Sequence, residues 1–166
     1  MYTASYAKIN LFLEITGKLA NNYHQVNTVL CSIDLCDFIS YSLLDYPEIS
    51  LSCSNPALSG KENLVFRVAE HLQQRYCPSQ GIKIHLEKHI PIAAGLGGGS
   101  SNAANCIKAL NTLWQLNLPQ NDLHEVAASF GSDINFFLLG GTALGTNRGE
   151  QVSQLPDIKL EQILLV

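Results

Sequence analysis

The residues best suited to chemistry lie in one glycine-rich segment near the middle of the chain. Residues 91–102 read PIAAGLGGGSSN, with four glycines among the five positions from Gly95 to Gly99. Such a segment lets the backbone approach a ligand closely, and its successive amides form a concave anion site. Ser100 and Ser101 add hydroxyl groups where a phosphate oxygen or a phosphate-bound Mg²⁺ would sit. The segment therefore predicts a phosphate-binding loop.

The flanking elements strengthen this prediction. Residues 81–87 alternate between apolar and polar side chains, which predicts a strand, and residues 100–116 carry apolar residues at helical spacing. The loop would thus end at a helix N-terminus, whose free N–H groups and positive dipole favour phosphate. The spacing matches neither a P-loop nor a dinucleotide fingerprint. The alternative is a flexible glycine loop before an ordinary N-cap serine; the strand–loop–helix context favours phosphate.

A second set of polar residues lies near the two ends of the chain. Residues 7–15 alternate, with Ala7, Ile9, Leu11, Leu13 and Ile15 forming one apolar row. This pattern predicts a half-buried strand that presents Lys8 and Asn10 on its other face, with Cα atoms about 6.6 Å apart. A solvated strand face is the simpler interpretation of Lys8 and Asn10. Asp133, taken alone, is interpreted as a turn or cap residue.

The remaining pattern predicts a two-layer α+β domain. Further strands are predicted at 27–33, 38–44, 49–52 and 142–146, and residues 17–24 are predicted to form a turn. Helices are predicted at 63–76 and from Pro119 to Gly131, and the helix at 100–116 should bury Ala103, Ile107, Leu110 and Trp114. Residues 162–166 form an apolar, strand-like run, from which we expect that the domain continues beyond Val166.

Composition excludes several classes of protein. The chain has 166 residues and a formal net charge of -4, and it has no Lys/Arg-rich run, so we expect no nucleic-acid partner. The five cysteines form no CxxC pair, which argues against a zinc site or a disulfide framework. No signal peptide and no apolar run of about 18 residues is visible. We therefore expect a cytoplasmic protein with no membrane partner.

Four ordered motifs resemble the GHMP kinases. Residues 91–104 are similar to the phosphate loop of that family, and the agreeing motifs are Ala7–Leu11, Tyr23-His24 and Gly131–Ile134 with Phe136-Phe137. The resemblance implies the two-layer N-terminal domain of these kinases, similar to the second domain of ribosomal protein S5. Residues 1–157 would form this ATP-binding domain, and residues 158–166 would begin a truncated C-terminal domain.

The resemblance also implies a reaction, with ATP and Mg²⁺ as cofactors. The family members most similar in the triple-glycine loop phosphorylate the 2-hydroxyl of 4-diphosphocytidyl-2-C-methyl-D-erythritol in non-mevalonate isoprenoid precursor synthesis. Asp133 would be the general base and Lys8 its catalytic partner, whereas Asn10, Tyr23 and His24 would bind the cytidyl diphosphate substrate. The implied ATP-binding residues are Asn63, Lys88, Pro91, Ile92, Ala93, Ala94, Gly95, Leu96, Gly97, Gly98, Gly99, Ser100 and Ser101. Mg²⁺ would be carried by ATP near Ser100.

Departures from the family leave alternatives open. Tyr6 and Asn135 stand where proline is common, and Asn21-Asn22 replaces the usual Asp-Gly before Tyr23. The second domain that closes the active site of family members is absent from these 166 residues, so we expect the chain alone to be inactive. The alternatives are a GHMP kinase for another small molecule and a nucleotide-binding module without catalysis.

Overall fold

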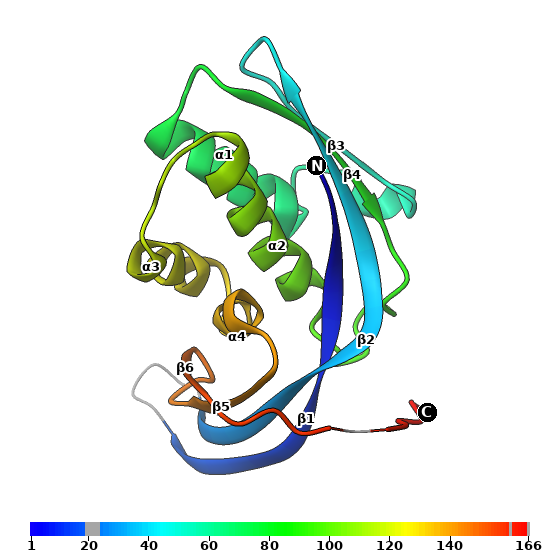
Figure 1. The fold of residues 1–166 in the computed structure, drawn as a ribbon, viewed down its shortest axis with the longest axis vertical. Helices are drawn as coiled ribbons and strands as arrows, with labels where there is room; N and C mark the ends of the chain where they lie inside the picture. Colours follow the sequence, from blue (N-terminus) through cyan, green and yellow to red (C-terminus); the bar gives the residue numbers. More distant parts are fainter. Residues whose placement is uncertain (19–23, 160, 166) are drawn as a thin grey trace.

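In the computed structural model, one mixed β-sheet carries helices on one face (Figure 1). The structure describes residues 1–18, 24–159 and 161–165. The strands in this part are β1 (Tyr2–Lys18), β2 (His24–Leu44), β3 (Ile49–Cys53), β4 (Gly81–Glu87), β5 (Thr142–Thr146) and β6 (Gln151–Gln154). The helices are α1 (Leu64–Tyr76), α2 (Gly98–Leu113), α3 (Gln120–Phe130) and α4 (Ile134–Leu139), with a 3₁₀ turn at Pro56–Leu58. The predicted two-layer α+β architecture is confirmed.

The long strand β2 organises the sheet. Along one edge it pairs with β1, antiparallel, over most of its length. Along the other edge, residues 38–44 pair with β4 and residues 28–31 pair with β5. β3 runs parallel to β4, and β6 runs antiparallel to β5. Along this second edge, residues 32–37 of β2 lie between the segments paired with β5 and β4. Side chains and loops can therefore reach the β2 backbone there.

The core lies between the sheet and the helices. The alternation predicted for residues 81–87 is confirmed, because Ile82, Ile84 and Leu86 of β4 are all buried. The predicted inner face of α2 is also buried: Ala103, Ile107, Leu110 and Trp114. Each fully buried side chain of this size contributes roughly 1.5–3 kcal/mol relative to an exposed one. This packing fixes the N-terminus of α2 against the sheet.

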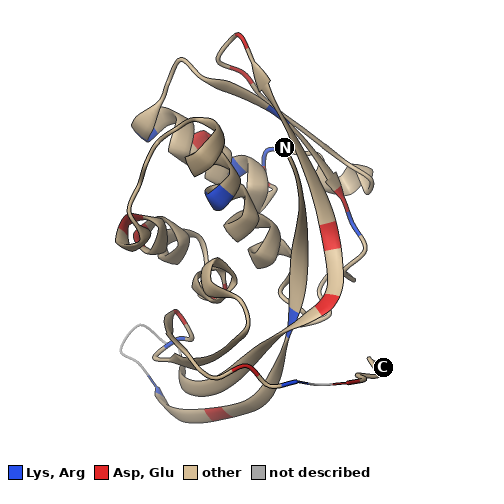
Figure 2. Ribbon diagram, viewed as in Figure 1, with Lys and Arg blue, Asp and Glu red and all other residues tan. Residues whose placement is uncertain are grey.

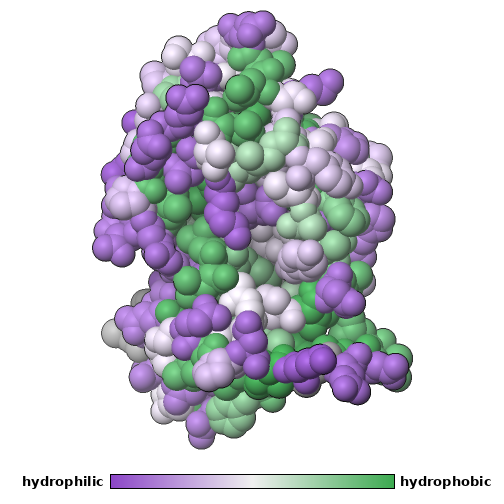
Figure 3. All heavy atoms as spheres, viewed as in Figure 1, coloured by the Kyte–Doolittle hydropathy of each residue, from purple (hydrophilic) through white to green (hydrophobic). Residues whose placement is uncertain are grey.

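The first strand departs from the predicted pattern beyond Ile9. Leu11, Leu13 and Ile15 are 41%, 58% and 60% exposed rather than buried. The register shifts between Asn10 and Phe12, where β1 carries one extra residue opposite β2. A reversal of faces at this bulge does not account for the exposure, because Phe12, on the opposite face, is also 50% exposed. The lower end of the β1–β2 ribbon curves beneath β5 and β6, beyond the helices (Figure 1), and apolar residues are exposed in that lower part of the molecule (Figure 3).

Other predicted boundaries also differ. The strands predicted at 27–33 and 38–44 are one strand, β2, because β1 pairs with both segments. The helix predicted at 100–116 starts two residues earlier and ends at Leu113. Helix α4 and strand β6 were not predicted, since each is too short to show a period. The strand predicted at 162–166 is wrong over residues 162–165, which form no ladder; Val166 lies outside the described residues.

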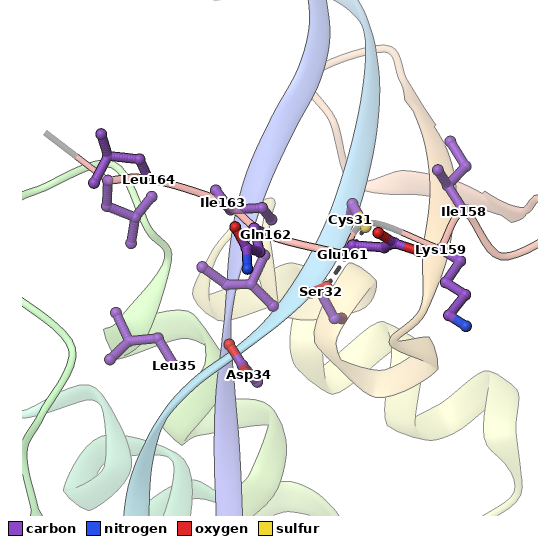
Figure 4. Close-up of a pocket in the computed structure, with 12 residues that line it drawn as sticks. Cys31, Ser32, Asp34, Leu35, Ile158, Lys159, Glu161, Gln162, Ile163 and Leu164 are labelled. Carbon is purple, nitrogen blue, oxygen red and sulfur yellow. Dashed lines mark hydrogen bonds between the residues drawn. The ribbon is translucent and has the colours of Figure 1, made fainter.

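After β6 the chain turns back across the sheet. Thr142 N donates to Asp157 Oδ1 at 2.9 Å, and Ile158 N donates to Thr142 Oγ1 at 3.2 Å. Described residues between 158 and 165 then pass β2 and leave a hollow of about 760 Å³ against Cys31–Leu35 (Figure 4). None of the predicted site residues lines this hollow.

Charged residues are scattered over the fold (Figure 2), as they are along the sequence. Acidic and basic residues are scattered over the elements, with no basic face in the view of Figure 2. Within the described residues, no helix is both long and apolar enough to cross a membrane.

Candidate active site

The glycine-rich loop forms a wall of a pocket of about 430 Å³ between β4, α1 and α2. Ten consecutive residues, from Pro91 to Ser100, line it. The other lining residues are Leu58, Glu62, Asn63, Leu64, Leu86, Lys88 and Asn102. The pocket therefore brings together all the predicted ATP-binding residues except Ser101.

The loop ends at an open helix N-terminus. Gly97 is the N-cap of α2 with φ of 69°, and no described side chain caps the helix there. The first amides of a helix have no partner inside the helix, so those of α2 remain available to a ligand. Backbone amides and a positive helix end together form an anion site. The local structure matches the predicted phosphate-binding loop.

Three consecutive glycines face different surroundings. A Cβ at Gly97 would lie 2.7 Å from Phe137 Cζ and 3.1 Å from Lys8 Cγ. A Cβ at Gly98 would lie 3.0 Å from Ile90 Cγ2 and 3.1 Å from Lys88 Nζ. A Cβ at Gly99 would meet no described atom within 4 Å. The first two glycines thus allow close packing, whereas the third leaves space above the start of the helix.

Ser101 and Asn63 make contacts within the protein. Ser101 Oγ donates to Tyr6 O at 2.5 Å and lies 2.8 Å from Ser5 Oγ, so this hydroxyl points inward rather than into the pocket. Asn63 caps α1 by accepting from Val65 N at 2.9 Å. Asn63 also lines the pocket, so capping α1 is compatible with the predicted ATP-binding role of this residue.

Lys8, Asn10 and Asp133 meet beside the loop. Lys8 is only 7% exposed, and its Nζ donates to Asn10 Oδ1 at 2.6 Å. The same Nζ lies 3.6 Å from Asp133 Oδ2. The backbone amide of Lys8 donates to Leu96 O at 3.0 Å, which joins this cluster directly to the loop. Residues more than 120 positions apart are therefore assembled at one point.

Asp133 is well placed for proton transfer. It stands at the N-cap of α4, yet its side chain makes no capping hydrogen bond within the described structure. The side chain is 39% exposed, whereas that of Lys8 is 9% exposed. A partly exposed carboxylate next to a held ammonium can accept a proton from an incoming hydroxyl.

A buried carboxylate that the sequence reading missed lies beneath the loop. Asp37 of β2 is fully buried, and its Oδ2 forms an ion pair with Lys88 Nζ. Its Oδ1 accepts from the amides of His89 at 2.7 Å and Ile90 at 2.8 Å. A signal was present: Asp37 shares the period-two face of the buried Ile39 and Tyr41. A charged residue on a core face must be paired.

Of the two residues predicted to bind the cytosine, the structure describes His24, and Tyr23 lies outside the described residues. His24 is exposed at the start of β2, four residues before Thr28, whose Oγ1 accepts from Asn10 Nδ2 at 2.7 Å. By strand rise, His24 lies about 13 Å from that contact along β2. The structure therefore does not bring His24 into the Lys8 cluster.

A protein-bound metal centre finds no support in the described part of the chain. No group of three or more His, Cys, Asp or Glu side chains gathers there in a way that could hold a metal ion. Mg²⁺ commonly binds through one or two carboxylates together with substrate phosphates. The side chains present fit a magnesium ion that arrives with a nucleotide.

Comparison with known proteins places this site in a family. Residues 63–141 match the family described as "GHMP kinases N terminal domain". A 4-diphosphocytidyl-2-C-methyl-D-erythritol kinase from Caldanaerobacter subterraneus subsp. tengcongensis is 42% identical over 162 residues, which cover 97% of this chain and 56% of that protein. The enzyme of the same name from Nostoc sp. is 43% identical over 96% of this chain and 52% of its own length. The chain thus spans about half the length of these relatives.

Solved structures agree with the sequence relatives. A crystal structure of 4-(cytidine 5'-diphospho)-2C-methyl-D-erythritol kinase has a TM-score of 0.80 and 34% identity, over 93% of this chain and 55% of that one. A Lactococcus lactis galactokinase, at 19% identity and a TM-score of 0.70 over 93% of this chain and 46% of its own, shares the fold. With the matched domain, the relatives and the fold in agreement, the chain belongs to the GHMP kinase family.

Proposed function

We propose that this chain is the ATP-binding part of a kinase that phosphorylates the 2-hydroxyl of 4-diphosphocytidyl-2-C-methyl-D-erythritol. One observation carries the proposal: the glycine loop of the pocket is hydrogen-bonded to Lys8, and Lys8 lies 3.6 Å from Asp133. A phosphate site, a cation and a carboxylate base are thus adjacent. Phosphoryl transfer requires mainly this positioning and charge stabilisation.

The nucleotide occupies the pocket with its phosphates at the start of α2. The amides of Gly98, Gly99 and Ser100 face the phosphates, where the absent Cβ of Gly99 leaves space. Asn63 and the apolar residues Leu58, Leu64 and Leu86 surround the base at the far side of the pocket. Ser101 supports the site indirectly, by fixing the helix start to Tyr6.

Asp133 and Lys8 carry the chemical step. Asp133 accepts the proton of the substrate hydroxyl while that oxygen bonds to the γ-phosphorus and the bond to the ADP oxygen breaks. Lys8 stabilises the negative charge that gathers on the transferring group and keeps the Asp133 carboxylate oriented. Asn10 holds the Lys8 ammonium and offers its amide to the substrate. When bound with ATP, Mg²⁺ neutralises phosphate charge near Ser100.

The substrate assignment rests on relatives and on the loop. Two relatives at 42–43% identity are named for the cytidyl substrate, and they align with almost all of this chain. We propose that Tyr23 and His24 bind the cytosine; His24 lies at the start of β2. Tyr23→Ala should then weaken cytidine-nucleotide binding without changing ATP binding.

The test is ATP consumption by the complete protein with a panel of alcohols. The panel contains the cytidyl diphosphate alcohol, mevalonate, homoserine and galactose. Turnover with the cytidyl compound alone supports the proposal, and turnover with another alcohol identifies a different GHMP kinase. ATP binding without turnover of any member would identify a non-catalytic nucleotide-binding module. The domain division at residue 157 and the cytoplasmic location stay predictions.

A further inference from the structure

The buried carboxylate of Asp37 has four hydrogen-bond donors around it. The amides of His89 and Ile90 donate to Oδ1, and Lys88 Nζ and Asn102 Nδ2 donate to Oδ2, the latter at 2.9 Å. Its position in the sheet explains the first two donors. The ladder between β2 and β4 begins at the Phe38–Glu87 pair, so the chain after Glu87 has left β2. The Asp37 side chain accepts from the amides of this departing segment.

The same carboxylate joins the two ends of the phosphate loop. Lys88 precedes the loop and Asn102 follows it, and Lys88 Nζ also donates to Asn102 Oδ1 at 3.2 Å. Asn102 Nδ2 donates further to Ser5 Oγ at 3.1 Å, which connects the network to β1. Asp37, Lys88 and Asn102 therefore form a closed triangle beneath residues 91–101.

The charge of Lys88 is already compensated in this triangle. Its side chain is 10% exposed, and that of its partner Asp37 is fully buried. If the ammonium moved to a phosphate, it would leave a buried carboxylate without a counter-ion, which is strongly unfavourable. This geometry opposes the simplest role for a lysine at the edge of a nucleotide pocket, which is a direct phosphate contact.

We infer that Asp37 is a positioning residue for the nucleotide site, and that Lys88 acts through Asp37 rather than on the phosphates. The inference rests on the proposed function, because it needs a nucleotide in the pocket. Asp37 fixes the spacing between the start of the loop and the start of α2, so the loop amides converge before ATP arrives. Preorganised donors cost no rearrangement when the ligand binds.

This inference predicts an unusual order among variants. Lys88→Met leaves the Asp37 charge buried and unpaired next to the pocket, where it repels the triphosphate. Adding Asp37→Asn removes that charge while the amide oxygen can still accept from His89 and Ile90. The double variant should therefore bind ATP more tightly than Lys88→Met alone. A lysine in direct contact with phosphate predicts the opposite, since the second change could not replace the lost contact.

The experiment measures binding of a non-hydrolysable ATP analogue with Mg²⁺ to the complete protein by calorimetry. We expect Lys88→Met to raise the Kd about tenfold and Asp37→Asn/Lys88→Met to recover most of that loss, a coupling within the range for residues in contact. Lys83→Met, which removes an exposed lysine from β4, the strand that ends just before Lys88, is the matched control and should bind as the wild type. Steady-state kinetics should show the same order in KM for ATP.

Two results would overturn the inference. If Lys88→Met and the double variant weaken binding of the ATP analogue equally, Lys88 contacts the phosphates directly. Unchanged Kd values with lowered melting temperatures would reduce Asp37 to a purely structural residue. If Asp37→Asn alone does not fold, the comparison between Lys88→Met and the double variant still decides. A wild-type protein that does not bind the analogue would refute the proposed function itself, and the inference with it.

Discussion

Two Lys–Asp pairs lie on either side of the glycine loop, and they are built in opposite ways. In the pair Lys88–Asp37 the carboxylate is fully buried and accepts from four donors. In the pair Lys8–Asp133 the carboxylate is 39% exposed and lies 3.6 Å from its ammonium. The residue types are the same, so the surroundings must decide what each pair does.

The difference shows how burial and partner number separate a scaffold pair from a reactive one. Asp37 is fully buried and each of its carboxylate oxygens accepts two hydrogen bonds, so a substrate has no access to it. Asp133 keeps access to solvent and has a lysine close enough to orient it. Perturbed and paired charges occur at both functional and structural sites, and access distinguishes them here.

The largest effect should come from breaking the pair Lys8–Asp133, here called the open pair because its carboxylate is partly exposed. Asp133→Asn removes the proton acceptor but keeps the size and shape of the side chain. We expect kcat of the complete protein to fall about 10²–10⁴-fold, the range for loss of a general base. Binding of an ATP analogue should persist, because the loop amides do not depend on Asp133. Turnover within about threefold of the wild type, with the cytidyl substrate, would remove Asp133 from the mechanism.

Breaking the pair Lys88–Asp37, here called the closed pair because its carboxylate is fully buried, should instead lower the stability of the fold. Asp37→Asn leaves the Lys88 ammonium buried without a counter-ion, a change that typically costs about 3–5 kcal/mol of unfolding free energy. Urea denaturation of the wild type and the variant measures the difference. Asp133→Asn is the matched control: the Lys8 side chain is as buried as that of Lys88, but Lys8 keeps its hydrogen bond to Asn10 Oδ1, and the 3.6 Å ion pair that it loses is with a partly exposed carboxylate, so the loss should be smaller. Equal losses in the two variants would abolish the distinction between the pairs.

Alanine at three neighbouring glycines would sharpen the comparison. Gly97→Ala should disturb the open pair, since the new methyl meets Phe137 and Lys8 and the φ of 69° is strained, at roughly 1–3 kcal/mol. Gly98→Ala should disturb the closed pair through Lys88 and Ile90. Gly99→Ala meets no described atom and should keep its stability while weakening ATP binding. Thermal melts and ATP titrations of the three variants check this; a melting temperature lowered most in Gly99→Ala would contradict it.

The smallest effect concerns a lysine that has no carboxylate partner among the described residues. The side chain of Lys108 on α2 is exposed overall, but its Nζ donates to Phe137 O at 3.1 Å, and desolvation of this ammonium by the surrounding protein lowers the pKa of Lys108 from 10.5. Below its folded pKa the protein keeps a disfavoured charge, and this penalty disappears as pH rises towards 10.5. The stability of the wild type relative to Lys108→Met should therefore improve from neutral to alkaline pH.

Urea denaturation of the wild type and Lys108→Met from neutral to alkaline pH measures how the difference in their unfolding free energies changes. Taking this difference cancels the contributions of the other groups that titrate in the same range. Lys83→Met, on the exposed face of β4, is the control for removing a positive charge from another surface position. A difference that stays constant, or that moves in favour of Lys108→Met at high pH, would contradict the assigned cause.

Elements with a complete local signal could be predicted from the sequence. Strand β4 has the predicted bounds because its alternation is regular and Gly81 and Glu87 end it. Helix α3 lies between Pro119 and Gly131 as predicted, since proline and glycine mark the two ends. The start of α2 was displaced because Gly98 and Gly99 are poor helix formers, and the contact of Gly98 with Ile90 and Lys88 depends on the fold.

Features that depend on distant contacts could not be predicted. The row from Leu11 to Ile15 is exposed because this end of the β1–β2 ribbon extends beyond the helices (Figure 1), so that Phe12 on the other face is exposed as well; alternation alone does not reveal this. The site residues Lys8, Asn10 and Asp133 came from a resemblance between motifs, and only the fold shows that they meet. Asp37 belongs to no motif; its partners Lys88 and Asn102 lie 51 and 65 positions away.

The hydrogen bond from the Lys8 amide to the Leu96 carbonyl has a mechanical consequence. The residue that carries the ammonium is joined to the loop through its own backbone, so this bond restrains the distance between the two segments. The ring of Phe137, packed on Gly97, connects the loop in turn to the short helix that begins after Asp133. Cation, loop and base are thus linked by direct contacts, and a displacement of one of them requires these contacts to break or to shift with it.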